Sequence, residues 1–388
     1  MKIVGSILLV IAMSIGGGLL SLPAVTSESG FIYSCLILFF IWLVMTIGAF
    51  FILEVCLQLP KGANLISMAK DTLGIPGKLC MLFCYLILLY CIMCVYISGG
   101  TDLINSIFTS LDINITTKLS TLIFTISLGC ITWFGINLVD KTNRILMSIK
   151  MILLFLLILT LIPSVDINNL IPGDIYKIQQ SILPIIFSFG FAIIIPSLRD
   201  YLENDVKSLR LVIIIGSVIP LVCFILWIYV VQGVIPHNNL QEITQSGEVI
   251  SALNIGLSNV GNPWVTTFIH LFTTICLLTA FLAVSLSLSD FISNGINKPK
   301  KGLSKYIIFS LTFLPPLMII IFKPYIFISA IHYAGILIVI VLILLPTLMM
   351  RKIKNIQCNK RSSKVQALLI NSMAIIAIIL LLFTCYQA

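Results

Sequence analysis

The chain has 388 residues, of which 59% are hydrophobic and 10% are charged, and its formal net charge is +9. Its mean hydropathy of +1.15 is more than a soluble core of this length needs, and apolar runs of about 20 residues recur throughout, as in membrane-spanning helices. These properties exclude a soluble globular protein and leave no stretch for a separate soluble domain.

We predict an all-α polytopic membrane protein, a single domain over residues 1–388 with eleven transmembrane helices. The predicted spans are about 3–25, 31–59, 78–108, 119–139, 145–163, 181–202, 209–233, 263–293, 306–322, 325–350 and 365–386. An odd number of spans leaves the two termini on opposite sides of the membrane.

The first span contains the stretch Ser14–Pro23, which cannot all be regular helix because Gly16, Gly17 and Gly18 follow one another. Each glycine costs about 1 kcal/mol in a helix interior, and a broken backbone survives in hydrocarbon only where it lines a cavity or binds something. Freed amides at the start of the second half-helix would hold an anion, and freed carbonyls at the end of the first half would hold a cation. The alternative is that the glycines only allow another helix to pack closely.

The third and fifth spans each carry a polar residue of interest. Tyr90 lies near the middle of the third span, where it either borders a site or packs. Lys150 lies a few residues inside the fifth span. It either extends its stem to the membrane surface or forms a buried amine that exchanges a proton during transport.

The sixth span has a second interruption at Ser188, Phe189, Gly190, Phe191 and Ala192. If spans one to five and six to ten form two halves, the two interruptions occupy corresponding positions. Paired interruptions of this kind indicate a transporter binding site near the middle of the membrane. The predicted halves are about 3–163 and 181–350, followed by an extra helix at about 365–386.

The loop charges predict the orientation of the chain. With the N-terminus in the cytoplasm, the cytoplasmic side holds all but three of the 23 basic residues, the exceptions being Lys118, Lys177 and Lys323. This distribution follows the positive-inside rule. The net charge is therefore a topology signal, and nothing else supports a nucleic-acid partner.

Several short motifs occur in an order that resembles a known family. They are Ser14–Gly18 with Leu22-Pro23, Leu53–Val55, Tyr96–Gly100, Ser188–Phe191 with Pro196-Ser197, Ile214–Val222, Phe313–Leu317 and Tyr333–Gly335. Together they resemble the hydroxy and aromatic amino acid permease family of the amino acid–polyamine–organocation superfamily, and most closely its tyrosine and tryptophan permeases. One departure is Ala192, where related aromatic permeases often carry a polar residue, commonly histidine.

The resemblance implies a leucine-transporter-like fold with two inverted repeats of five helices, discontinuous helices 1 and 6, and an extra helix 11. It implies proton-driven symport of an aromatic amino acid across a bacterial inner membrane, with the N-terminus cytoplasmic and the C-terminus periplasmic. The substrate carboxylate would meet the amides of Gly16–Gly18, and its ammonium would face carbonyls near Ser14 and Ser188–Phe189, with Ile15 at the break.

The resemblance also assigns residues to proton coupling and gating. Lys150 matches a lysine in related permeases and is expected to couple protons. Asp290 resembles the aspartate of an inner gate, with Lys2 as its partner, and Glu54 is a further gate element. A solvated helix-end charge is the alternative for each of these carboxylates.

Other classes of function fit less well. A membrane enzyme would need clustered catalytic groups, such as paired carboxylates or a His-Glu-x-x-His run, and the sequence contains none. We interpret the eleven cysteines as small buried hydrophobic residues, and we expect no cofactor or metal. A serine or threonine permease of the same family is the alternative among transporters.

Overall fold

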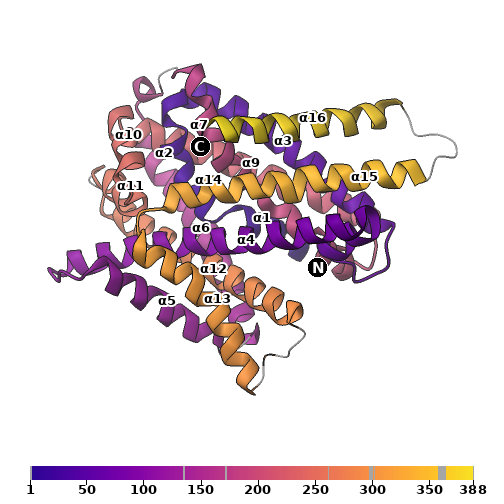
Figure 1. The fold of residues 1–388 in the computed structure, drawn as a ribbon. Helices are drawn as coiled ribbons and strands as arrows, with labels where there is room; N and C mark the ends of the chain where they lie inside the picture. Colours follow the sequence, from indigo (N-terminus) through magenta and orange to yellow (C-terminus); the bar gives the residue numbers. More distant parts are fainter. Residues whose placement is uncertain are drawn as a thin grey trace.

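The computed structural model describes residues 2–133, 136–170, 173–260, 262–296, 300, 302–356 and 364–387. Within these ranges the chain is helical and contains no strand (Figure 1). The helices are α1 (Lys2–Ser14), α2 (Gly17–Val25), α3 (Gly30–Leu57), α4 (Leu65–Ser110), α5 (Thr117–Trp133), α6 (Ile136–Leu161), α7 (Ile178–Ser188), α8 (Ile195–Tyr201), α9 (Val206–Val234), α10 (His237–Ser246), α11 (Val249–Ser258), α12 (Pro263–Gly295), α13 (Gly302–Phe322), α14 (Phe327–Ile338), α15 (Leu345–Ile356) and α16 (Lys364–Gln387). Six shorter helical turns, η1 to η6, connect or interrupt them.

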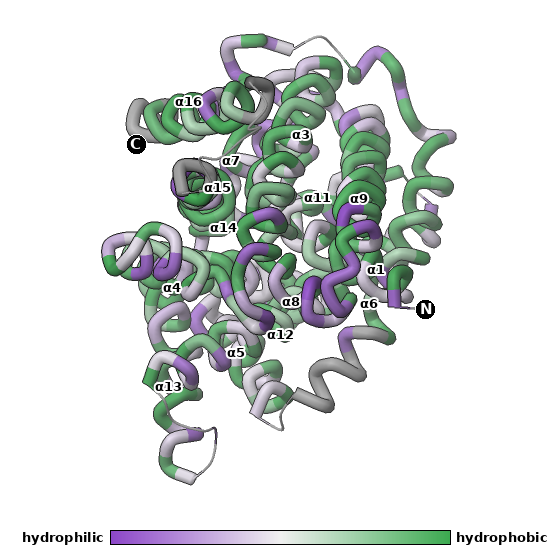
Figure 2. Tube along the Cα trace, turned by 90° about the vertical axis from the view of Figure 1, so that its right-hand side faces the viewer, coloured by the Kyte–Doolittle hydropathy of each residue, from purple (hydrophilic) through white to green (hydrophobic). Residues whose placement is uncertain are grey.

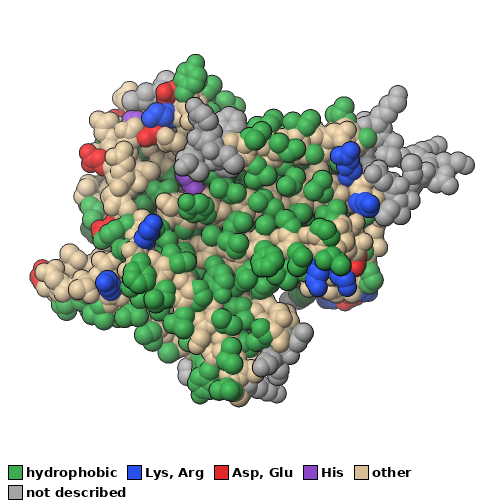
Figure 3. All heavy atoms as spheres, viewed as in Figure 1, with side chains coloured by type: hydrophobic (Ala, Val, Ile, Leu, Met, Phe, Trp, Pro, Cys, Tyr) green, Lys and Arg blue, Asp and Glu red, His purple; other side chains and the backbone are tan. Residues whose placement is uncertain are grey.

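Eight of the described helical segments are long and apolar enough to cross a membrane, or nine if the bent pair α1 and α2 forms one span. Two more predicted spans are present as shorter apolar helices, Thr117–Trp133 and Ala367–Leu382. Apolar side chains cover the middle of the molecular face in Figure 3, whereas charged side chains gather toward its two ends. The end-on view in Figure 2 shows hydrophilic segments where α4, α8 and α9 reach the end that holds the N-terminus. The chain is therefore a multi-pass membrane protein.

The interrupted helices lie inside the bundle. Helix α2 packs against α7, and α1 packs against η5 (Gly190–Ile194). Around them, α3 packs on α9, α12 on both α4 and α6, and α14 on both α4 and α7. Residues 14–25 are all buried. The bundle therefore encloses the first interruption on all sides.

The structure differs from the predicted spans in several places. Among them, α5 ends at Trp133 rather than near residue 139, and α6 begins at Ile136 rather than near residue 145. Helix α4 starts at Leu65 rather than near residue 78, because Asn64 and Ser67 form a reciprocal cap and the chain then turns sharply at Gly74, whose φ is 75°. Helix α10 (His237–Ser246) lies in the stretch predicted as a connection. A π-helical segment, η6 (Val339–Leu344), interrupts the tenth predicted span, which hydropathy alone does not reveal.

Candidate functional site

The first interruption lies between α1 and α2, as predicted. The Ile15 amide still donates to Ile11 O at 2.9 Å, but Gly16 leaves the helical conformation with φ −148° and ψ −141°. The axes of α1 and α2 differ by 47°. Gly16 has no side chain with which to cap α2, and the Tyr96 hydroxyl lies at the Gly17 amide instead. The first amides of α2 form a potential anion site.

The carbonyl freed by this interruption has a lysine partner. Lys150 of α6 is only 2% exposed, and its Nζ donates to Ile15 O at 2.5 Å. Within the described residues it forms no ion pair with a carboxylate. The alternative in which Lys150 extends to the membrane surface is wrong for this conformation, because the ammonium points into the bundle.

The second interruption separates α7 from α8 and is also present as predicted. Ser188 ends α7, with its Oγ donating to Pro184 O at 2.9 Å, and Gly190 begins the short helix η5. The ring of Phe189 packs edge to face against Phe224 of α9, with ring centroids 5.1 Å apart. Phe191 and Ala192 are fully buried.

The two interruptions are in direct contact. A Cβ added to Gly18 would lie 3.0 Å from Ser188 Cα and closer still to Ser188 Oγ, so only glycine allows the backbones to approach this closely. A Cβ on Gly17 would lie 2.7 Å from the Tyr96 ring, whereas one on Gly16 would lie 3.3 Å from the Tyr96 hydroxyl. Packing alone therefore requires glycine at residues 17 and 18, whether or not a ligand binds there.

Tyr96, and not Tyr90, lies at the first interruption. The Tyr90 hydroxyl donates to Leu311 O of α13 at 2.7 Å, which directs it away from Gly16–Gly18. Tyr96 is 7% exposed and covers Gly16 and Gly17. The run Tyr96–Gly100, where a polar aromatic residue precedes small residues, is the sequence signal for it. Its contact with α2 depends on how α4 packs.

The three predicted gate residues form ion pairs, each with a partner that the sequence did not indicate. Lys2 Nζ lies 2.5 Å from Glu203 Oε1, and Glu54 Oε1 lies 2.6 Å from Arg210 Nη2. The predicted pairing of Lys2 with Asp290 is wrong for this conformation. Helix α1 packs on α9 and η5 and so reaches the connection after α8, whereas Asp290 ends α12 elsewhere in the bundle.

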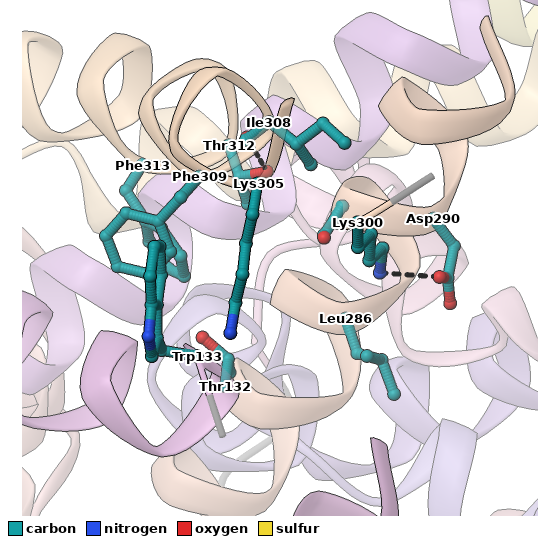
Figure 4. A pocket seen from close by; sticks show the side chains of 11 residues that line it. Thr132, Trp133, Leu286, Asp290, Lys300, Lys305, Ile308, Phe309, Thr312 and Phe313 are labelled. Atoms are coloured by element: carbon teal, nitrogen blue, oxygen red, sulfur yellow. Dashed lines mark hydrogen bonds and ion pairs between the residues drawn. The ribbon is translucent and has the colours of Figure 1, made fainter. Parts of the chain in front are cut away.

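Asp290 lies in a small pocket between α5, α12 and α13 (Figure 4). Its Oδ1 is 2.6 Å from Lys300 Nζ, and the ammonium of Lys305 lies 4.2 Å from the centre of the Trp133 ring. Phe309 forms the neighbouring wall of the pocket. The pocket is separate from both helix interruptions.

Sequence reasoning also missed Arg199 on α8. This side chain is 4% exposed, and its guanidinium donates to Leu59 O at 2.9 Å and also to the carbonyls of Cys56 and Pro60. Its Nε donates to Asn204 Oδ1 at 2.5 Å. Arg199 therefore satisfies the carbonyls at the end of α3 and ties that end to α8.

No group of three or more histidine, cysteine, aspartate or glutamate side chains in the described part of the chain could hold a metal ion. The arrangement offers instead backbone amides, backbone carbonyls, a buried ammonium and a tyrosine hydroxyl. These groups can bind a small zwitterion and exchange a proton, and they contain no nucleophile with an adjacent base.

Comparisons with known proteins find relatives that are named as amino acid transporters. The tyrosine-specific transport system 1 of Haemophilus influenzae is 30% identical over 362 residues, which cover 92% of this chain and 90% of that protein. The tryptophan-specific transport protein of the same organism is 29% identical, covering 90% of this chain and 87% of that protein. The glutamine transporter 2 of Aliivibrio fischeri is 28% identical, covering 90% of this chain and 88% of that protein. The model of the tryptophan/tyrosine permease family matches residues 1–387, so the chain belongs to that family of membrane transporters and is not an enzyme.

Proposed function

We propose that the protein imports an aromatic amino acid, tyrosine or tryptophan, by proton symport through alternating access. The observation that carries this proposal is the direct contact between two interrupted helices, at Gly18 and Ser188, inside the bundle. Discontinuous helices of this kind present unpaired backbone groups to a substrate near the middle of a membrane. Relatives named for tyrosine and tryptophan transport support the aromatic substrate.

The helix contacts support two inverted repeats, about 3–163 and 181–350, with an extra helix at about 365–386. If α1–α2 corresponds to α7–α8, α3 to α9, α4 to α12, α5 to α13 and α6 to α14–α15, then the first four elements each pack against their own counterpart. The pairing of α6 with α12 corresponds to that of α14 with α4, and the pairing of α1 with α9 corresponds to that of α7 with α3. Contacts that interchange in this way are expected of a two-fold axis in the membrane plane.

In this scheme the amides at the start of α2, from Gly17 onward, bind the substrate carboxylate. The carbonyls that end α1 and α7, near Ser14 and Ser188, bind its ammonium. The small side chain of Ala192 leaves volume for an aromatic ring. Tyr96 covers the amides in the closed conformation and would move, or bond to the carboxylate through its hydroxyl, when substrate enters.

Uptake of labelled tyrosine and tryptophan into proteoliposomes tests the substrate. We expect each to be displaced by the other and barely by serine or glutamine. Displacement by serine would favour a serine or threonine permease instead. Displacement by glutamine would favour the activity for which the Aliivibrio fischeri relative is named. Either result would overturn the aromatic assignment.

Lys150 is the proposed proton carrier. Removing an ammonium from water is unfavourable, so a lysine that is hydrated in one conformation and dry in another binds a proton in the first and releases it in the second. By linkage, each protonation state then favours one conformation. The hydrogen bond from Lys150 to Ile15 O connects this proton directly to the hinge between α1 and α2.

Lys150→Met removes the proton and keeps much of the side-chain volume. We expect the variant to retain substrate binding but to lose accumulation driven by an inward pH gradient. Lys207→Met, which changes an exposed lysine at the start of α9, serves as the matched control and should behave as the wild type. If Lys150→Met still concentrates substrate with normal pH dependence, Lys150 is not the carrier.

The proposed location is a bacterial inner membrane, with the N-terminus cytoplasmic and the C-terminus periplasmic. Ala388 itself lies outside the described residues, as do four of the basic residues predicted to be cytoplasmic, Lys298, Lys301, Lys360 and Arg361. An alkaline phosphatase fusion at the C-terminus should be active, and fusions at Lys301 or Lys354 should be inactive. The opposite pattern would overturn this orientation.

A further inference from the structure

A buried carboxylate at the end of the bundle opposite the N-terminus has no role in the proposed mechanism. Asp102, near the end of α4, is 7% exposed. Its Oδ2 accepts from the amides of Ile250 at 2.9 Å and Ser251 at 3.0 Å, and Ser251 Oγ donates to Oδ1. Ser251 Oγ also lies 3.2 Å from the Asp102 carbonyl oxygen.

These contacts hold the start of helix α11. Its own cap residue, Glu248, makes no side-chain capping bond, so Asp102 supplies from another helix the acceptor that the first amides of α11 lack. A carboxylate does this better than a neutral group, because hydrogen bonds from N–H and O–H to a charged acceptor are about twice as strong. Protonation would put a hydrogen on an oxygen that now accepts, and the cap would weaken.

Helix α11 connects this cap to the candidate substrate site. It packs against α4 and α12 and also against α2, whose first amides form the proposed carboxylate site. Val249, Ile250, Leu253 and Leu257 are buried in this packing. Figure 1 shows α10 and α11 together at the end of the bundle away from the N-terminus. A change in how firmly α11 is held therefore alters its packing against the half-helix α2.

We propose that Asp102 is a proton-binding site on the proposed periplasmic side, which holds α11 against the bundle when ionised and loosens it when protonated. This goes beyond proton carriage by Lys150, because Asp102 lies in a different contact and acts on α11 rather than on the hinge. It makes Asp102 a positioning residue: it orders the helix that packs over α2 and does not touch the proposed substrate.

Other ionisable groups near this contact must be separated from Asp102. At this end of the bundle, on or beside the elements that pack against α11 and α4, they are Glu248, His237, Glu242, His270, Lys118, Lys323 and His332. Helix α2 carries none. The two main rivals are Glu248, the cap residue of α11, whose charge acts on Asp102, and His270 of α12. The Nδ1 atom of His270 lies 3.4 Å from Asn254 Nδ2 in the middle of α11.

Hydrogen exchange in a peptide covering residues 249–258, measured on the reconstituted full-length protein between pH 4.5 and 8, tests the proposal. After correction for the intrinsic pH dependence of exchange, we expect protection of these amides in the wild type to fall as the pH falls. In Asp102→Asn, protection at pH 8 should be lower than in the wild type by up to about tenfold, and it should not change with pH. Glu248→Gln and His270→Gln are the matched controls, and both should keep the wild-type pH dependence.

Ser251→Ala removes only the hydroxyl donor and so tests the proposal if Asp102→Asn does not fold. Losing one bond to the charged form should move the midpoint of the protection curve upward by about one pH unit. A purely structural cap would lower protection equally at every pH. The proposal is overturned if the wild type shows no pH dependence or if Ser251→Ala leaves the midpoint in place. It is also overturned if Glu248→Gln or His270→Gln abolishes the dependence. No substrate is needed, so the outcome is independent of the proposed transport activity.

Discussion

Substituting Gly18 with alanine probes the contact between the two interrupted helices. The added Cβ would lie 3.0 Å from Ser188 Cα, which is the lower limit of the separations that real Cβ atoms show, and closer still to Ser188 Oγ. Ser188 is 2% exposed and already bonded to Pro184 O, so its side chain has little room to turn. Overpacking of this kind costs about 1–3 kcal/mol. We expect Gly18→Ala to lower the free energy of unfolding by that amount.

Ser188→Gly removes Oγ and Cβ, the side-chain atoms that the new methyl group would meet, and leaves only the contact with Cα at 3.0 Å. The double variant should therefore be more stable than the two single effects predict, by about 1 kcal/mol or more. Gly190→Ala is the matched control. Its Cβ would meet only the flexible tip of Ile338, at 3.3 Å, so we expect a smaller loss of stability.

Thermal unfolding in detergent and equilibrium binding of labelled tyrosine, measured on the same samples, separate packing from binding. If Gly18 serves packing alone, the double variant recovers both stability and affinity. If the amides of Gly17 and Gly18 bind the carboxylate, stability returns but affinity stays low, because the methyl group obstructs the approach of the ligand. Wild-type stability in Gly18→Ala, or additive effects in the double variant, would refute the steric argument.

Three further substitutions test individual contacts. Arg199→Lys keeps the charge but loses the planar guanidinium that reaches three carbonyls. We therefore expect thermal unfolding to show a free energy of unfolding lower by about 3 kcal/mol, and wild-type stability would contradict this. Lys2→Glu breaks the ion pair with Glu203, so reagents from the N-terminal side should label a cysteine introduced at the substrate site faster. Adding Glu203→Lys should restore the pair and slow the labelling again. If it does not, the ion pair has no gating role. The ammonium of Lys2 holds the pKa of Glu203 below its ordinary value of 4.5, so the ion pair is present above that pH and is lost only as the pH falls further. The difference in labelling between Lys2→Glu and the wild type should therefore be constant from about pH 5.5 to 8. Gly16→Ala should impair uptake less in a Tyr96→Phe background, because its Cβ would meet the tyrosine hydroxyl; equal impairment in both backgrounds would remove Tyr96 from the site.

The sequence by itself determined the class of the protein and the positions of its interruptions. Apolar runs of membrane length report burial in lipid directly, and consecutive glycines at Gly16–Gly18 disfavour helix wherever they occur. Both are local effects of composition. The motifs around these interruptions were also sufficient to indicate the family.

Only the tertiary structure decided which side chains meet these interruptions. Lys150, Tyr96 and Ser188 reach the first interruption from distant parts of the chain. In the same way Arg199 reaches the end of α3, and Asp102 reaches the start of α11. A sequence shows that a backbone group will be left without a helical partner. It does not show which distant side chain will satisfy that group, because the choice depends on how the helices pack.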